Sequence, residues 1–243
     1  MDRRVMRVTG KDALPFLQGL VSNDVLPLAR GPGLVWTALL TPQGKYLVDF
    51  FVANTGSDLL LDLPEALADS TLQRLGLYRL RADVRFAASD LPVTRGTGAA
   101  PPAALPDPRH ADLGWRLYGK AEVAPVDWDA IRVAHVIPET GIELQPGESY
   151  LLETGFDRLH GVDFRKGCYV GQEVTARMRH KTDLRKGLAR VQLSQSVPVG
   201  TKILSKGKEV GAVHTQSGGA AIAYLRFDRS DGDLRAGPAV VTV

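Results

Sequence analysis

Residues 166–173 have the sequence Lys-Gly-Cys-Tyr-Val-Gly-Gln-Glu, and Cys168 is the only cysteine in the chain of 243 residues. Gly167 and Gly171 flank it, and glycine permits a positive φ or a close approach to a ligand. In the residues that follow, apolar side chains stand four apart among charged ones, which is typical of a short amphipathic helix. The stretch predicts a glycine-hinged loop that carries Cys168 to the start of a helix.

The thiol of Cys168 is the candidate catalytic group. A helix N-terminus and the ammonium of Lys166 both favour the thiolate, which predicts a reactive thiol. The residue types alone support equally well a small, buried hydrophobic cysteine. A cysteine hydrolase with His160 or His180 as the base is a weaker alternative, since no oxyanion element or third orienting group is evident.

Other motifs limit the chemistry further. The sequence has no dinucleotide-binding glycine motif and no Walker A motif. The five histidines show no metal-ligand spacing with Cys168 or with one another, so we expect no metal site. Because an iron–sulfur cluster usually needs four protein ligands, a chain with one cysteine contributes one ligand at most.

Composition places the chain among globular proteins, with 44% hydrophobic and 23% charged residues. No apolar run reaches the 18 residues of a membrane span, and the N-terminal residues lack the hydrophobic segment of a signal peptide. A single cysteine allows no internal disulfide, which fits a reducing compartment. We therefore expect a cytoplasmic protein with no membrane partner.

The first half of the chain shows alternating β and α patterns. The expected elements are strands at 3–8, 34–40, 46–53, 58–63 and 77–86 and helices at 11–21 and 64–76. The succession of strand, strand, helix and strand predicts a ferredoxin-like lobe over about 34–96. An Ala/Pro-rich stretch at 97–108 predicts a linker between lobes.

The last sixty residues change to a period of two. Five short strands separated by glycine turns are expected at 187–193, 201–205, 209–215, 220–227 and 239–243. They predict a small antiparallel barrel. The chain thus divides into an α+β region at 1–183 and a C-terminal β-barrel at 184–243.

The sequence Lys-Gly-Cys-Tyr-x-Gly-Gln-Glu resembles the signature of the YgfZ-type folate-binding proteins. These proteins assist iron–sulfur protein maturation and are related to the glycine cleavage T protein, a tetrahydrofolate-dependent aminomethyltransferase. Further collinear similarities span residues from about 3 to 227 and lie at 16–25, 41–50, 78–84, 132–139 and 153–157.

The resemblance implies a T protein-like cloverleaf around a folate-sized central pocket, with tetrahydrofolate as the ligand. A pterin needs a flat apolar slot with a carboxylate or amide at its edge, and its glutamate tail needs cations. The residues implied in folate binding are Asn23, Glu153, Lys166, Gly167, Tyr169, Gly171, Gln172, Glu173 and Arg177.

The chain has a formal net charge of +3, and basic residues cluster after the signature. The cluster consists of Arg177, Arg179, Lys181, Arg185 and Lys186. It fits a solvated helix face, with Glu173 and Arg177 pairing at i,i+4, or an anion-binding surface for a folate tail or an RNA backbone. Nucleic-acid binding is not expected, because the motif aromatics of RNA-binding proteins are absent.

The implied function is that of a folate-binding accessory protein in iron–sulfur cluster assembly or repair. Its partners would be assembly proteins or client enzymes, including tRNA-modifying ones. The alternative is a folate-dependent aminomethyl or one-carbon transferase, and the sequence leaves open whether the protein is an enzyme. The signature cysteine favours the first function, because one-carbon transfer to folate needs a carboxylate and not a thiol. A scaffold that has lost folate is the third possibility.

Overall fold

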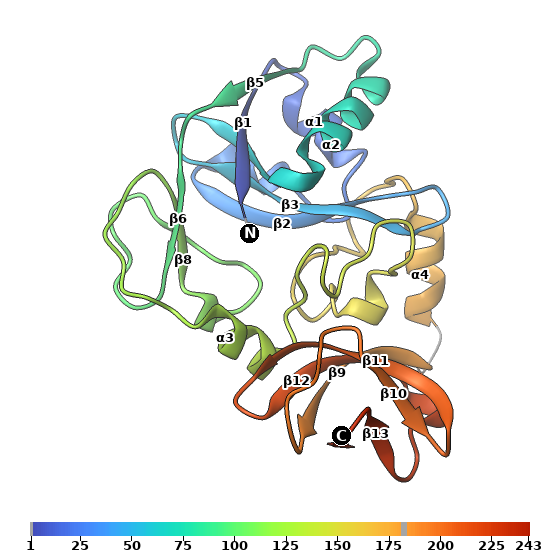
Figure 1. Ribbon diagram of the computed structural model, residues 1–243. Coiled ribbons are helices and arrows are strands. Elements are labelled where there is room, and N and C mark those ends of the chain that lie inside the picture. The colour runs from blue at the N-terminus through green and yellow to red at the C-terminus, as the bar shows by residue number, and fades with distance from the viewer. Residues whose placement is uncertain (1, 181–183) are drawn as a thin grey trace.

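The computed structural model describes residues 2–180 and 184–243. Its N-terminal lobe is built on a five-stranded antiparallel sheet, in the order β2-β3-β4-β1-β5 (Figure 1). The strands are β1 (Arg3–Thr9), β2 (Gly33–Leu40), β3 (Tyr46–Asn54), β4 (Leu59–Pro64) and β5 (Arg85–Ser89). The connections include the helices α1 (Ala13–Gln18), η1 (Leu26–Arg30) and α2 (Glu65–Arg79).

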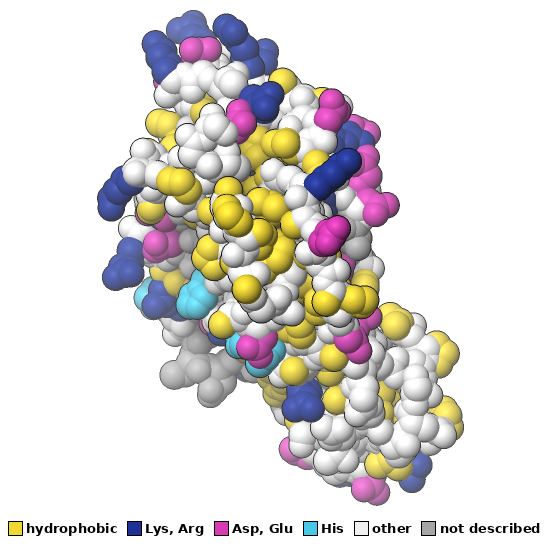
Figure 2. Space-filling model, turned by 90° about the vertical axis from the view of Figure 1, so that its left-hand side faces the viewer, with side chains coloured by type: hydrophobic (Ala, Val, Ile, Leu, Met, Phe, Trp, Pro, Cys, Tyr) yellow, Lys and Arg dark blue, Asp and Glu magenta, His cyan; other side chains and the backbone are white. Residues whose placement is uncertain are grey.

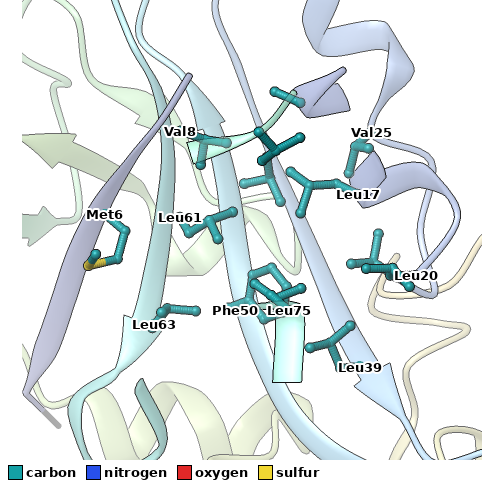
Figure 3. Packing of buried hydrophobic residues seen from close by; sticks show 14 of the residues in the cluster. Met6, Val8, Leu17, Leu20, Val25, Leu39, Phe50, Leu61, Leu63 and Leu75 are labelled. Atoms are coloured by element: carbon teal, nitrogen blue, oxygen red, sulfur yellow. The ribbon is translucent and has the colours of Figure 1, made fainter. Parts of the chain in front are cut away.

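The strand order β3-β4-β1-β5, with α1 after β1 and α2 after β4, is the ferredoxin-like arrangement. Because β1 pairs with both β4 and β5, the lobe begins at residue 3 and not at the expected residue 34. Leu17 of α1, Leu75 of α2 and Phe50 of β3 belong to one buried cluster between the helices and the sheet (Figure 3). Apolar residues at helical spacing on α1 and α2 therefore cover one face of the sheet.

A second, smaller sheet follows, in the order β6-β8-β7. Its strands are β6 (Val93–Gly96), β7 (Leu105–Pro106) and β8 (Trp115–Tyr118). The stretch 97–108, expected as a linker, thus contributes an edge strand, a place in a sheet that tolerates proline. The short helix η2 (Ala111–Leu113) precedes β8, and α3 (Trp128–His135) follows it, with the Asp127 side chain accepting the N–H of Ala130.

The C-terminal region forms a closed antiparallel barrel, in the order β10-β11-β12-β9-β14-β13. Its strands are β9 (Lys186–Leu193), β10 (Lys202–Ser205), β11 (Lys208–Ser217), β12 (Ala220–Arg226), β13 (Leu234–Ala236) and β14 (Ala239–Thr242). The short helix η4 (Phe227–Arg229) follows β12. The predicted barrel is confirmed, and it contains β13 in addition to the five expected strands. It projects at one end of the molecule (Figure 2).

The segment between α3 and the barrel packs on the face of the main sheet opposite α1 and α2, and includes η3 (Leu152–Thr154) and α4 (Gln172–His180). Its core contains Trp36 of β2 and Phe156, whose stacked rings have centroids 4.0 Å apart. This core fixes residues 137–169 against the sheet. Among the described residues, no helix is both long and apolar enough to cross a membrane.

Candidate functional site

Cys168 is exposed on the loop 165–171, which we call the signature loop and which leads into α4. The alternative of a buried structural cysteine is therefore wrong. Gly171 has a φ of +83°, and a Cβ at this position would lie 2.5 Å from the carbonyl oxygen of Thr41. Glycine is thus required where the loop touches the β2–β3 turn. Gly167 has neither a positive φ nor an atom near its missing Cβ, so the conformational role expected for it is wrong.

The side chain of Lys166 holds the signature loop against the C-terminal end of α1. Its buried Nζ donates to the backbone carbonyls of Gln18, the last residue of α1, at 2.7 Å, and of Val21, which follows α1. Burial lowers the pKa of Lys166 to about 8. The ammonium thus donates to two carbonyls, and its expected effect on the thiol stays a prediction. The carboxylate of Asp163 accepts the backbone N–H groups of Arg165 and Lys166, at 2.6 and 3.3 Å.

Two adjoining hollows lie beside the loop, and we call them together the signature groove. The smaller has a volume of about 280 Å³ and the larger about 610 Å³. Both hollows are lined by Asp163, Phe164 and Arg179. The guanidinium of Arg179 lies 3.8 Å from the ring centroid of Phe164. The smaller is lined in addition by Tyr169, Gln172, Ala176 and His180, and the larger by Asn23, Asp24, Pro27, Leu34, Val35, Pro108, His160, Val162 and Arg165.

The groove brings together three of the predicted folate-binding residues. Tyr169 and Gln172 line the smaller hollow, and Asn23 lines the larger, where its amide donates to the carbonyls of Trp36 and His160 at 2.8 and 2.7 Å. Glu173 and Arg177 are exposed on α4 and do not line the groove.

Glu153 lies elsewhere, at the barrel. Its carboxylate accepts the Tyr224 hydroxyl at 2.7 Å and faces the ammonium of Lys186 at 3.6 Å. Lys186 of the basic cluster is therefore held at the barrel and not beside Arg177 and Arg179, while Lys181 lies outside the described residues. On the face shown in Figure 2, Lys and Arg side chains lie scattered among acidic and hydrophobic ones.

A third hollow lies where β3, β6, β8 and α3 meet, and we call it the arginine pocket. It is lined by Arg3, Asp49, Phe51, Arg95, Arg109, Leu113, Arg116, Trp128, Arg132, Pro138, Glu139 and Thr140. Its free volume is about 50 Å³, which is smaller than a folate molecule requires. These arginines are far apart in the chain and follow no common motif, so the sequence does not predict that they converge.

His110, Asp112 and His135 also come together, although no metal-ligand spacing was visible in the sequence. The Nε2 atom of His135 lies 2.6 Å from the Asp112 carboxylate, and the two imidazole rings stack with centroids 3.7 Å apart at 25°. Because the rings are stacked, their in-plane nitrogen lone pairs run nearly parallel and do not converge on one ion. We assign no metal to this cluster.

The sequence is similar to those of known iron–sulfur cluster assembly factors. Residues 185–243 match the family model described as CAF17, C-terminal beta-barrel domain. The chain is 32% identical over 216 residues to the mitochondrial iron-sulfur cluster assembly factor IBA57 homolog of Mycosarcoma maydis, covering 76% of this chain and 54% of that protein. It is 29% identical over 276 residues to human mitochondrial iron-sulfur cluster assembly factor IBA57, covering 96% and 78%. The chain thus spans about half the length of the Mycosarcoma maydis protein.

The fold has a solved counterpart in the glycine cleavage system aminomethyltransferase T of Bartonella henselae. The TM-score is 0.74 at 12% identity, with 98% of this chain and 81% of that chain covered. The predicted T protein-like α+β fold is confirmed. The expected cytoplasmic location is wrong, because the relatives are mitochondrial proteins by name. The chain is therefore similar to the IBA57-type iron–sulfur cluster assembly factors, has the T protein-like fold, and resembles the CAF17 C-terminal β-barrel domain over residues 185–243.

Proposed function

We propose that this chain is an accessory factor of iron–sulfur cluster assembly that presents the thiol of Cys168 to a partner protein. The observation that carries the proposal is the position of this thiol, exposed on a loop whose neighbouring residues are held in place. Lys166 fixes the loop to α1, and Gly171 fixes it to the β2–β3 turn. The names of the relatives support the assignment to cluster assembly.

A thiol presented in this way has a defined chemical role. A cluster is usually held by four thiolates or a mixed ligand set, so one cysteine supplies one ligand and the partner supplies the others. Because the loop is already ordered, little conformational entropy is lost when the partner docks. The clients that we propose are iron–sulfur enzymes, with radical enzymes that modify tRNA among them.

We further propose tetrahydrofolate as the ligand of the signature groove. Its hollows, of about 280 and 610 Å³, are in the range of small-molecule sites. Phe164 and Tyr169 offer aromatic surface for a pterin, and the Gln172 amide offers hydrogen bonds to the ring edge. Arg165 and Arg179 supply cations for the carboxylates of the glutamate tail.

Calorimetric titration of tetrahydrofolate into the wild-type chain and three variants tests the groove. We expect Gln172→Ala to weaken binding by about tenfold, the effect of losing about one hydrogen bond to the ligand. Glu173→Ala is the matched control, because Glu173 is next to Gln172 on α4 but exposed and outside the groove. Cys168→Ala should bind as the wild type does. Absence of saturable binding to the wild type would refute the folate proposal and leave the thiol proposal standing.

One-carbon transfer is the second candidate function, and the groove contains a carboxylate that such chemistry requires. Asp163 lines both hollows, and its Oδ1 atom accepts two backbone N–H groups. Transfer of an aminomethyl carbon to bound tetrahydrofolate, lost in Asp163→Asn but retained in Cys168→Ala, would favour the transferase over the assembly factor.

A further inference from the structure

The arginine pocket gathers five guanidinium groups, and their ion pairs with nearby carboxylates are unevenly distributed. Arg3 and Arg116 both pair with Asp62, at 2.5 and 2.8 Å. Arg109 pairs with Asp107 at 2.7 Å, and Arg116 reaches the same carboxylate at 3.9 Å. Three guanidinium groups therefore share two carboxylates on this side of the pocket.

The acidic groups that line the pocket are committed to other partners. The carboxylate of Asp49 accepts the Trp36 indole N–H at 2.8 Å, the Tyr46 hydroxyl at 2.7 Å and the Thr140 hydroxyl. Glu139 pairs with Arg132 at 3.0 Å. Neither forms a hydrogen bond or an ion pair with Arg95 within the described part of the chain.

Two donor groups of the pocket are left without a partner. Arg95 forms no ion pair or hydrogen bond with the residues that the structure describes, and its guanidinium lies 4.4 Å from the Trp128 ring centroid. Burial, together with the charges of Arg116 and Arg109, lowers the pKa of Arg95 to about 10. The side chain of Arg116 is 3% exposed, and its buried Nε has no hydrogen-bond partner among the described residues. Buried donors of this kind are costly unless a ligand or water satisfies them.

The shape of the pocket limits what such a ligand can be. Its free volume of about 50 Å³ has room for a few water molecules or one compact ion of four or five heavy atoms. Guanidinium groups already cover its aromatic rings, since Arg116 lies 4.0 Å from the Phe51 ring centroid and Arg95 lies over Trp128. A ligand that binds by stacking on a ring is therefore disfavoured, and a small anion is favoured.

We propose that the arginine pocket binds a small oxyanion, of the size of inorganic phosphate, between Arg95 and Arg116. Guanidinium groups recognise such ions through paired N–H···O bonds. The bound ion would connect β6, β8 and α3 and neutralise the unpaired charge of Arg95. This site is separate from the signature groove, because none of the residues lining one hollow lines the other.

Thermal unfolding of the full chain in increasing inorganic phosphate tests the proposal, with sodium chloride holding the ionic strength constant. We expect a saturable rise in Tm for the wild type and for the control Arg85→Gln, whose side chain is 80% exposed on β5. Arg95→Gln should lose the rise, and Arg95→Lys should retain part of it, because lysine keeps the charge but not the fork of donors. A parallel titration with acetate, which has four heavy atoms, distinguishes a carboxylate ligand from phosphate.

The stability of Arg95→Gln supplies a second readout. Without an oxyanion, this variant should be at least as stable as the wild type, because a buried unpaired charge has been removed. In saturating oxyanion the order should reverse. Equal Tm shifts in wild type and Arg95→Gln, or no shift of the wild type with either ion, would overturn the proposal. Neither result bears on folate binding in the signature groove.

Discussion

Gly167 and Gly171 flank the same cysteine and have different roles. Both are expected from the sequence to relieve backbone strain, yet only Gly171 has a positive φ. The difference comes from the β2–β3 turn, which is distant in sequence and lies against Gly171, whereas no atom lies within 4 Å of the missing Cβ of Gly167. The residue types therefore predict the signature loop, but only the contact with the β2–β3 turn shows that glycine is required at position 171 and not at 167.

Gly171→Ala should destabilise the chain by roughly 2–4 kcal/mol, from the strained φ and the clash of its Cβ with the carbonyl of Thr41. Gly167→Ala is the matched control and should change the free energy of unfolding by less than about 0.5 kcal/mol. Urea denaturation of the two variants measures both values. Similar losses in both would show that the loop is not docked as described.

Lys166 gives the signature loop a pH-dependent stability. Its folded pKa of about 8 lies below the ordinary 10.5, so between these values the unfolded chain binds more protons than the folded one. The free energy of unfolding therefore rises with pH through this window, and the burial cost is fully present below pH 8. From pH 7.5 to 9.5, wild type should gain roughly 2 kcal/mol relative to Lys166→Met. Urea denaturation at several pH values measures the difference, and parallel pH profiles would contradict it.

At the scale of elements, Glu143 joins α3 to the barrel. One carboxylate oxygen accepts the backbone N–H and the hydroxyl of Thr215 on β11, at 3.1 and 2.6 Å. The other accepts a guanidinium N–H of Arg132 on α3 and the backbone N–H of Glu139 at 2.9 Å. A buried carboxylate with four donors fixes how the barrel sits on the rest of the chain.

Glu143→Gln should therefore destabilise the protein by roughly 3 kcal/mol, because Arg132 loses a buried counter-charge and one oxygen becomes a donor group. A double-mutant cycle with Thr215→Val should give a coupling energy of at least about 1 kcal/mol, measured by urea denaturation. Tyr224→Phe, at the separate contact with Glu153, is the comparison and should be additive with Glu143→Gln. Additivity of Glu143→Gln with Thr215→Val would contradict this junction.

Periodicity predicted most elements, and it failed at residues 77–86. The strand expected there is in part the end of α2, which continues to Arg79, and β5 begins at Arg85. Leu77 and Leu80 lie in this stretch and are 73% and 89% exposed. A local pattern cannot show which side of an element faces solvent, and this error follows from that limit.

At the scale of the whole molecule, collinear motifs predict the T protein-like fold, and a period of two in the last sixty residues predicts the barrel. The arginine pocket could not be predicted, because Arg3, Arg95, Arg109, Arg116 and Arg132 converge only when the two sheets and α3 meet. The same convergence leaves a free volume of about 50 Å³ in this pocket. Of the residues implied in folate binding, Asn23, Tyr169 and Gln172 lie in one groove, whereas Glu153 belongs to the barrel contact.

The central claim is that the exposed thiol of Cys168 acts in iron–sulfur cluster assembly. The most direct test expresses the chain, behind a mitochondrial leader, in human cells depleted of their IBA57 and measures the activity of iron–sulfur enzymes. Wild type and the control Gly167→Ala should restore activity, and Cys168→Ala should not, although its Tm should match that of the wild type. Full restoration by the folded Cys168→Ala variant would contradict the account.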